Sequence, residues 1–448
     1  MRLPALMHRL PVTALVCTVA LAAYITPASA QVVTINGDYL VDDVTHATSQ
    51  VFSQIVVGHN ANATLTIHDG RLVGATTGPD AMTLGRALTS ALSSVTAVVN
   101  VIGNQSRLQV NANLDIARNF NASRTVTGIL NVGAGGHARV QEVAFSFGNF
   151  PCESIVTVSG PGSLFETVTT LSMRQVTSPS RVSTLRIEPG GTVSVGTTIA
   201  VTGSPDIILD GGTLSLTDPS ALPVSGIIQF NSGALRFRSS QTLAAGPGFL
   251  TDFYGSPPVF GTDRGLVIDG TTTLATSLLL DGGSLSTARI AVNPSTGSLV
   301  LNGGTLTLTG EGAVIDDGGD FGPDPLMVGD GVGAPMLLEL DGAGDVLLGA
   351  VMVAADGTLD FGGESLIVDS LNNGGSVSIA DATLDVRAGL VNTGSLSLAD
   401  VVVEGGVTSP AGAKIDVAGT VVFNGDYTGA AAFYGSGTLV FNGTLSVD

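Results

Sequence analysis

The stretch Asn302-Gly-Gly-Thr-Leu-Thr-Leu308 decides the fold. Its second half alternates hydroxyl and apolar side chains, which is the period of a β-strand with one buried face. Its first half is a turn, because Asn and Gly tolerate the positive φ angles that tight turns require. Asp210-Gly-Gly-Thr-Leu-Ser-Leu216 is a near copy, and Asp281-Gly-Gly-Ser-Leu285 is a third member. The chain is therefore predicted to repeat a strand-turn unit.

The spacing of these units indicates the size of the repeat. A step of 21 residues separates Asp281 from Asn302, and one of 18 separates Asn424 from Asn442. About 20 residues suit one coil of a β-solenoid, since a coil needs several short strands and their turns. The predicted fold is an all-β solenoid of degenerate repeats. Several β-sandwich domains are the alternative, because their hairpins use the same turns.

Composition agrees with a narrow, stacked core. The 448 residues are 44% hydrophobic and only 5% aromatic, with 60 glycines and no tryptophan. This is too apolar for a disordered chain. Further alternating segments are predicted to be strands at 63–67, 184–187, 213–216, 298–301 and 305–308.

The charged residues argue against a nucleic-acid partner, and they are distributed unevenly along the chain. With 17 basic and 37 acidic side chains, the protein lacks the cations that nucleic-acid binding needs. Residues 31–290 carry 17 acidic and 13 basic side chains, whereas 291–448 carry 20 acidic and two basic. We expect a near-neutral N-terminal solenoid region and an acidic C-terminal one. Aspartates serving as turn residues would explain the shift, and a cation-binding or repulsive face is the alternative.

Residues 1–30 have the pattern of a secretory signal peptide. Arg2 and Arg9 form a positive start, Val12–Tyr24 is apolar, and Ala28-Ser29-Ala30 is a cleavage site. The mature chain is expected to be exported to the bacterial surface or the extracellular space, with the outer membrane and periplasm as alternatives. It retains one cysteine, Cys152, and has no other apolar run long enough to span a membrane as a helix.

The repeat resembles that of a known class of exported proteins. Ile55-Val-Val-Gly58, followed by Ala63-Thr-Leu-Thr-Ile-His-Asp-Gly70, is similar to the repeat of bacterial autotransporter passengers and PEP-CTERM-associated surface proteins. Val156-Thr-Val-Ser-Gly-Pro-Gly-Ser163 resembles the strand that links such units. The resemblance implies a right-handed parallel β-helix, exported and displayed or shed at the cell surface. A piece of a longer autotransporter is a further possibility that it raises.

One acidic segment is the candidate metal site. Asp316, Asp317, Asp320 and Asp324 lie among glycines, and clustered carboxylates on a pliable backbone can supply oxygen ligands to Ca²⁺. The spacing matches neither the EF-hand loop nor the glycine-rich nonapeptide repeat. A solvated loop between two coils is the structural alternative. No other cofactor is predicted.

An enzyme is the main functional alternative, because parallel β-helices include polysaccharide hydrolases and lyases. The candidate groups are the pairs Asp42-Asp43 and Asp316-Asp317, together with His59, His137 and Lys414. Carboxylate pairs can perform acid–base glycoside chemistry. The sequence has a single lysine and few basic residues in its second half, which disfavours the lyases and hydrolases of this fold.

We therefore predict an exported, non-enzymatic surface or extracellular scaffold that resembles an adhesin. Its expected partners are surface glycans or other envelope proteins. The segments predicted to reach a partner lie near 75–90, 140–153, 245–262 and 316–335. The alternative is a β-helical polysaccharide-active enzyme or carbohydrate-binding protein.

Overall fold

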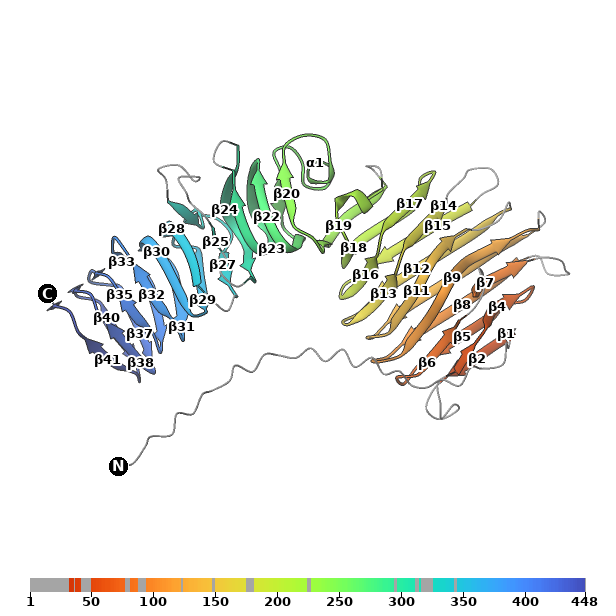
Figure 1. Ribbon diagram of the computed structural model, residues 1–448, viewed down its shortest axis with the longest axis horizontal. Helices are drawn as coiled ribbons and strands as arrows, with labels where there is room; N and C mark the ends of the chain where they lie inside the picture. The colour runs from red at the N-terminus through yellow and green to blue at the C-terminus, as the bar shows by residue number, and fades with distance from the viewer. Residues whose placement is uncertain are drawn as a thin grey trace, which may run out of the picture.

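The computed structural model describes most of the chain after the predicted signal peptide. The described residues are 32–35, 37–41, 50–76, 81–87, 94–121, 124–146, 150–174, 181–223, 227–293, 296–310, 314–315, 325–341 and 345–447. Successive coils stack along one long, curved axis, from the N-terminal end to the C-terminal end (Figure 1). The predicted signal peptide and the four aspartates of the candidate metal site lie outside the described residues.

The elements are almost all short strands. The N-terminal part contains β1 (Val32–Ile35), β2 (Gly37–Val41), β3 (Gln50–Phe52), β4 (Gln54–His59), β5 (Ala63–Ile67), β6 (Leu72–Ala75), β7 (Met82–Ala87), β8 (Ser94–Ile102), β9 (Arg107–Asn119), β10 (Thr125–Gly133), β11 (His137–Phe145), β12 (Cys152–Ser159), β13 (Ser163–Thr167), β14 (Thr170–Arg174), β15 (Arg181–Ile187), β16 (Gly191–Val195) and β17 (Thr198–Thr202).

The middle contains β18 (Asp206–Leu216), η1 (Pro219–Ala221), β19 (Ile228–Phe237), β20 (Gln241–Ala244), α1 (Phe249–Tyr254), β21 (Val259–Gly261), β22 (Arg264–Ala275), β23 (Ser277–Val292), β24 (Ser298–Leu308) and β25 (Val314–Ile315). The C-terminal part contains β26 (Leu326–Val328), β27 (Met336–Leu340), β28 (Asp345–Val353), β29 (Gly357–Gly362), β30 (Ser365–Asn373), β31 (Ser376–Ala380), β32 (Thr383–Val386), β33 (Leu390–Asn392), β34 (Ser395–Ala399), β35 (Val402–Glu404), β36 (Val407–Ser409), β37 (Lys414–Ala418), β38 (Thr420–Phe423), β39 (Tyr427–Gly429), β40 (Ala432–Gly435), β41 (Thr438–Phe441) and β42 (Leu445–Val447).

Each coil has three faces, and strands pair in parallel with the equivalent strands of neighbouring coils, although β17 does not pair with β20, nor β19 with β21. Face one begins with β1 pairing to β4, and face two with β2 pairing to β5. Face three begins with β3 pairing to β6 and continues strand by strand to β37 and β40. This architecture confirms the predicted parallel β-helix and excludes the β-sandwich alternative, whose sheets are antiparallel.

The core is one continuous column of apolar side chains. Alternate residues of each strand point inward, as in β12, whose residues are buried at every second position. Most inward residues form one cluster that extends from Ile35 to Tyr427, and a small second cluster consists of Ala87, Val95, Ala117, Val126 and Cys152. Each layer consists mainly of Val, Leu and Ile, which explains how a chain with few aromatic residues and no disulfide builds a core.

The Gly-Gly turns are corners between two faces rather than hairpin turns. In β18, β23 and β24 the chain passes from face two to face three at Gly211, Gly282 and Gly304, whose φ angles are +96°, +94° and +96°. A Cβ on Gly304 would lie 2.0 Å from the carbonyl oxygen of Gly283 in the preceding coil. Glycine is required there both for the backbone angle and for the close stacking of corners.

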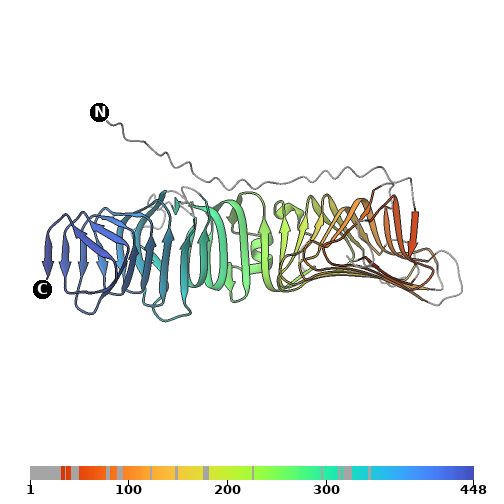
Figure 2. The ribbon, with the colours of Figure 1, turned by 90° about the horizontal axis from the view of Figure 1, so that it is seen from below.

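The predicted coil size holds for the C-terminal part and not for the N-terminal part. Leu280 pairs with Leu301, 21 residues on, and Phe423 pairs with Phe441, 18 residues on. Leu65, by contrast, pairs with Val99, 34 residues on. The N-terminal coils are accordingly wider than the C-terminal ones (Figure 1), and both belong to one stack along the same axis (Figure 2). The change in charge after Ile290 falls inside β23, where the core continues without a break.

Aspartates occupy several corners of the acidic part, as the turn interpretation predicts. Asp381 and Asp400 both have φ angles of +54°, which Asp tolerates better than most residues. The carboxylate of Asp400 also accepts a hydrogen bond from the backbone of Thr420 in the next coil, at 2.8 Å. Some of the excess acidic residues therefore have a structural role, because their carboxylates accept hydrogen bonds from backbone N–H groups at turns.

Two of the segments predicted to be presenting loops are largely strand. Residues 82–87 form β7, and β11 extends to Phe145 with Val143 and Phe145 buried, so the predictions at 75–90 and 140–153 were wrong for these residues. The composition of these two segments suggested loops, but in the wide N-terminal coils they continue as strands whose apolar residues are buried. The segment at 245–262 does contain an insertion, α1, but Phe253 and Tyr254 pack inward against Phe230 with ring centroids 6.1 and 5.8 Å away.

We predict that Gly304→Ala destabilises the solenoid by about 1–3 kcal/mol, because alanine is strained at this φ angle and its Cβ meets the neighbouring corner. Gly362→Ala is the matched control, since a Cβ there meets nothing within 4 Å, and its effect should stay within about 0.5 kcal/mol. Urea unfolding measures both. Equal stability of the two variants would show that the corner does not need glycine.

Candidate functional site

The four aspartates of the predicted metal site, Asp316, Asp317, Asp320 and Asp324, are in the segment that the structure does not describe. In the described part of the chain, no group of three or more His, Cys, Asp or Glu side chains is placed to hold a metal ion. Ca²⁺ binding at residues 316–324 thus stays a prediction.

The nearest described acidic residues serve the backbone. The carboxylate of Asp330 accepts hydrogen bonds from the backbone N–H groups of Val332 and Gly333, at 2.9 and 2.6 Å. These bonds hold the pKa of Asp330 below its usual range. Asp356, in the next coil, accepts from Gly331 at 2.7 Å. The two carboxylates stabilise a glycine-rich turn.

Of the groups proposed for an enzyme, the three that the structure describes do not come together. His59 ends β4 on face one, where it pairs with Arg86 of β7. His137 begins β11 and Lys414 begins β37, which both lie on face three but many coils apart. Asp42-Asp43 and Asp316-Asp317 lie outside the described residues.

A polar trough on face three is the candidate site, because three charged side chains line it. It has a volume of about 450 Å³ and crosses β13, β16, β18 and β19. Its lining combines hydroxyl groups with charged side chains and consists of Gly162, Ser163, Leu164, Glu166, Thr192, Ser194, Ser215, Arg236 and Arg238. Such a set can donate to and accept from the hydroxyl groups of a sugar, and its guanidinium groups can pair with carboxylates.

Charged residues of neighbouring coils flank one end of the trough. The Arg139 guanidinium lies 3.1 Å from the Glu166 carboxylate, and His137 Nε2 lies 3.5 Å from the same carboxylate. Burial lowers the pKa of His137, the Glu166 carboxylate opposes this shift, and Arg107 and Arg139 add to it. The imidazole is therefore held neutral at neutral pH, and Arg139 is the cation that pairs with Glu166.

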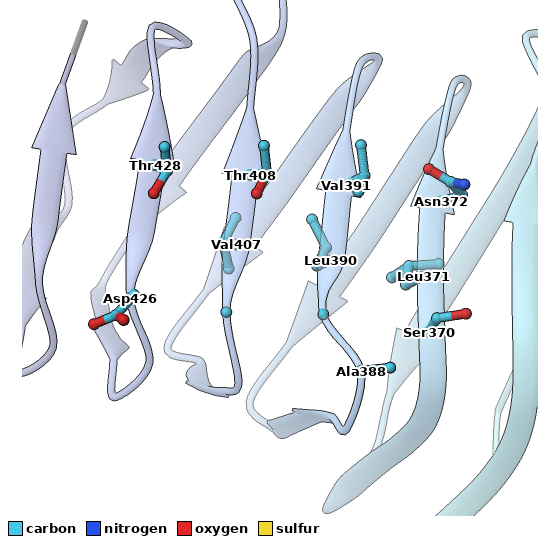
Figure 3. A pocket seen from close by; sticks show the side chains of 12 residues that line it. Ser370, Leu371, Asn372, Ala388, Leu390, Val391, Val407, Thr408, Asp426 and Thr428 are labelled. Carbon is cyan, nitrogen blue, oxygen red and sulfur yellow. The ribbon is translucent and has the colours of Figure 1, made fainter.

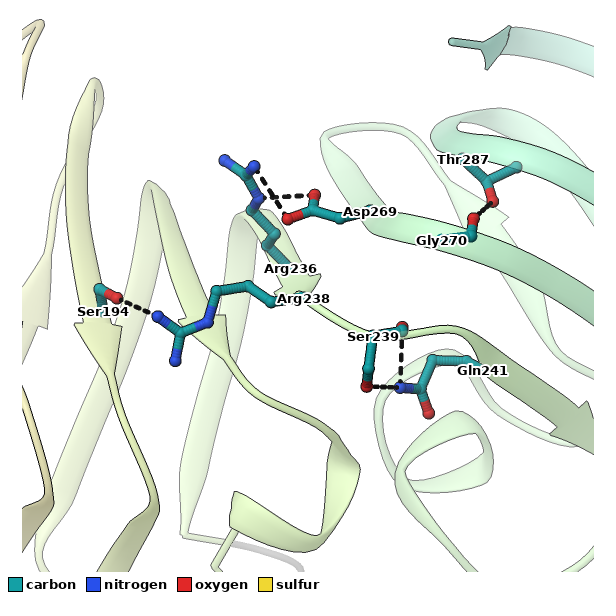
Figure 4. A network of polar contacts seen from close by, with 8 residues as sticks. All are labelled: Ser194, Arg236, Arg238, Ser239, Gln241, Asp269, Gly270 and Thr287. Carbon is teal, nitrogen blue, oxygen red and sulfur yellow. Dashed lines mark hydrogen bonds and ion pairs between the residues drawn. The ribbon is translucent and has the colours of Figure 1, made fainter. Parts of the chain in front are cut away.

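Two arginines close the other end (Figure 4). Arg236 forms a bidentate ion pair with Asp269, at 2.9 and 3.0 Å. Arg238 reaches back across the coils to Ser194 Oγ at 3.0 Å, the Val195 carbonyl at 2.6 Å and Thr217 Oγ1 at 3.1 Å. Arg238 thereby ties β19 to earlier coils next to η1.

A second, smaller trough of about 350 Å³ lies on face two in the C-terminal part (Figure 3). Asn372, Val391, Thr408 and Thr428 stand in register along it, and Asp426 lies at its edge. The backbone N–H of Thr444 donates to Asp426, which lowers the pKa of that carboxyl. Its lining has fewer charged groups than the trough on face three.

Sequence reasoning did not identify Arg139, Glu166, Arg236 or Arg238. They are separated by intervals that differ from coil to coil, so no fixed repeat period brings them together. The closest signal was the spacing of Arg236 and Arg238, two residues apart on one strand and so on the same side of it.

No family model matches this chain, and no curated protein matches it. The resemblance to autotransporter passengers therefore stays a prediction from the repeat. Within the described residues no helix has both the length and the apolar character needed to cross a membrane.

We expect Arg238→Met to destabilise the protein by about 1–3 kcal/mol, because three acceptors in neighbouring coils lose their donor. Arg387→Met is the matched control: Arg387 forms a single exposed pair with Asp369 at 3.3 Å, and its loss should cost less than about 1 kcal/mol. Urea unfolding and hydrogen exchange in β16 report the difference. Similar losses for both variants would contradict a clamping role for Arg238.

Proposed function

We propose that the protein is an exported, non-enzymatic scaffold at the bacterial surface or outside the cell, and that it acts in the manner of an adhesin. The observation that carries the proposal is the uninterrupted core from Ile35 to Tyr427. Because each coil rests on the next, the stack forms a stiff rod whose faces stay at fixed positions along its length.

Such a rod distributes recognition over its faces. Every outward row places one side chain per coil, at the spacing of about 4.8 Å between paired strands. The outward residues of face three are largely Ser, Thr, Arg, Asp and Glu, as at Thr192, Ser194, Ser215, Arg236 and Asp360. Extended glycans and the surfaces of envelope proteins suit a repeated polar surface of this kind.

Carbohydrate binding is the second candidate, and the trough on face three favours it. Thr192 supplies a hydroxyl group beside Glu166, and Ser163, Ser194 and Ser215 line the trough as buried residues. Among the described residues that line the trough, Glu166 is the one carboxylate, whereas glycoside hydrolysis generally uses a pair. The trough therefore supports binding of a sugar chain better than its cleavage.

The scaffold proposal predicts adhesion. Non-adherent bacteria that display the exported chain on an outer-membrane anchor should be retained several-fold more on surfaces coated with glycans or envelope proteins than bacteria with the anchor alone. Retention equal to that of the anchor alone, on every coating, would count against the proposal.

The same purified chain separates binding from catalysis. We expect it to bind acidic or neutral polysaccharides in titration calorimetry without shortening them, and Glu166→Gln to weaken binding. Arg387→Gln, on a different face, is the control and should bind as the wild type does. Depolymerisation that is lost in Glu166→Gln would establish the enzyme alternative instead.

A further inference from the structure

One row of outward side chains runs along face three, whose strand pairing is unbroken. Coil by coil, the row is Gln109, Arg139, Glu166, Ser194, Ser215, Arg236, Val267, Ser286, Thr307, Glu339, Asp360, Ser378, Ser397, Asp416 and Tyr434. Its cations lie in the first half and its anions mainly in the second half. The centre of the row, at Ser286, is uncharged.

The charges are arranged symmetrically about Ser286. Arg236 lies two strands before Ser286, and Glu339 lies two strands after it. Arg139 lies six strands before Ser286, and Asp416 lies six strands after it. Each cation of the row thus has an anion at the mirrored position.

At the neighbouring positions of the same strands, one further pair follows this pattern, whereas Arg107 mirrors the uncharged Ala432. Two residues beyond Arg236 and Glu339 stand Arg238 and Asp341, which are both exposed and held in register by backbone hydrogen bonds to the preceding coils. On the other side, Lys414 mirrors His137, whose ring is neutral at neutral pH. Glu166 mirrors Ser397, and Asp360 mirrors Ser215, so no anion of the row mirrors another.

This symmetry has a physical meaning for two copies of the chain. A twofold axis that lies between two faces and runs parallel to the strands reverses the order of the coils. It also leaves the position along the strand unchanged, so a given row of one copy faces the same row of the other copy. The row of one copy then faces its own reverse in the other, so that Arg139 meets Asp416, Arg236 meets Glu339, and Ser286 meets Ser286. Such contacts are self-complementary and form a closed pair.

The size of the face is sufficient for such a pair. From Gln109 to Tyr434 the row spans about 67 Å at about 4.8 Å per strand, and a strand of five residues is about 16 Å wide. The face therefore offers about 1,000 Å² on each copy, compared with about 800 Å² per partner in a standard stable interface. Val267, Ser286 and Thr307 at the centre are small enough to allow close approach.

We propose that face three is the contact surface between two antiparallel copies of this chain, aligned by the mirrored charges about Ser286. The opposite charges select the antiparallel alignment. In parallel copies in register, each charged side chain would face the same side chain of the other copy and be repelled. Salt weakens the pair, since Arg139 and Arg236 are half exposed.

Charge reversal with mixing tests the proposal directly. We expect the exported wild-type chain to sediment as a dimer in low salt and to dissociate in molar salt. Arg139→Glu with Arg236→Glu leaves only acidic charges in the row, and Glu339→Arg with Asp416→Arg replaces two of its four anions by cations. Each double variant alone should bind itself at least about tenfold more weakly.

An equal mixture of the two double variants should restore the dimer, because each then meets the opposite charge at both ends. Arg387→Glu on face one is the control and should leave the dimer unchanged. Circular dichroism and melting verify that each variant is folded. A monomeric wild type, or a dimer that neither reversal weakens, would overturn the proposal, as would failure of the mixture to recover.

Cysteine cross-linking tests the position of the axis independently. Ser286→Cys should form a disulfide between two copies under mild oxidation, because Ser286 faces itself. Ser378→Cys is the matched control in the same row, and it should not cross-link because it faces Ser194. The native Cys152 is buried, and burial raises the pKa of its thiol, so it stays unreactive. Equal cross-linking at both positions would place the contact elsewhere.

Discussion

The backbone hydrogen bonds between coils are the interaction on which the rest of the structure depends. In a parallel solenoid a coil satisfies the backbone of its strands only through the coils before and after it. These bonds fix the register, so every side chain lies on the equivalent side chain of the next coil. Leu285 lies on Leu306, which lies on Leu338, and the same register places Ser286 on Thr307 and Glu339. Core and surface rows are thus set by one constraint.

The corners show what this constraint demands of the sequence. Where two faces meet, the backbones of adjacent coils approach closely. A Cβ atom at Gly304 would collide with a carbonyl oxygen of the neighbouring coil. At other corners, Asp381 and Asp400 adopt a positive φ angle instead. Glycine and aspartate are therefore both turn residues here, and the acidic character of the C-terminal part arises partly from its corners.

The strands and the existence of stacked coils could be predicted from the sequence, because alternation and Asn-Gly or Asp-Gly turns are local signals. The face to which each strand belongs could not be predicted, since strands on all three faces show the same alternation of apolar and polar residues. Coil length was visible only where coils are short, as between Phe423 and Phe441. The loop predictions were wrong for residues 82–87 and 140–145, because the wide N-terminal coils continue there as strands.

The polar trough and the charged row escaped prediction for the same reason. Arg139, Glu166, Ser194 and Ser215 are successive members of one row, yet the number of residues between them changes with every coil. Variable corner segments lengthen a coil without moving its strands out of register. A sequence period therefore cannot reveal which residues share a row, whereas the pairing of backbones does so at once.

Net charge is consequently a poor guide to how this surface associates. The chain carries a formal charge of −20, which alone predicts mutual repulsion between copies. On face three, however, cations and anions are separated along the axis, so the field changes sign between its two halves. At the Debye length of about 8 Å in physiological salt, a charge responds mainly to its immediate neighbours. What decides attraction is then which rows meet, and only a reversed copy places the arginines of one half against the carboxylates of the other.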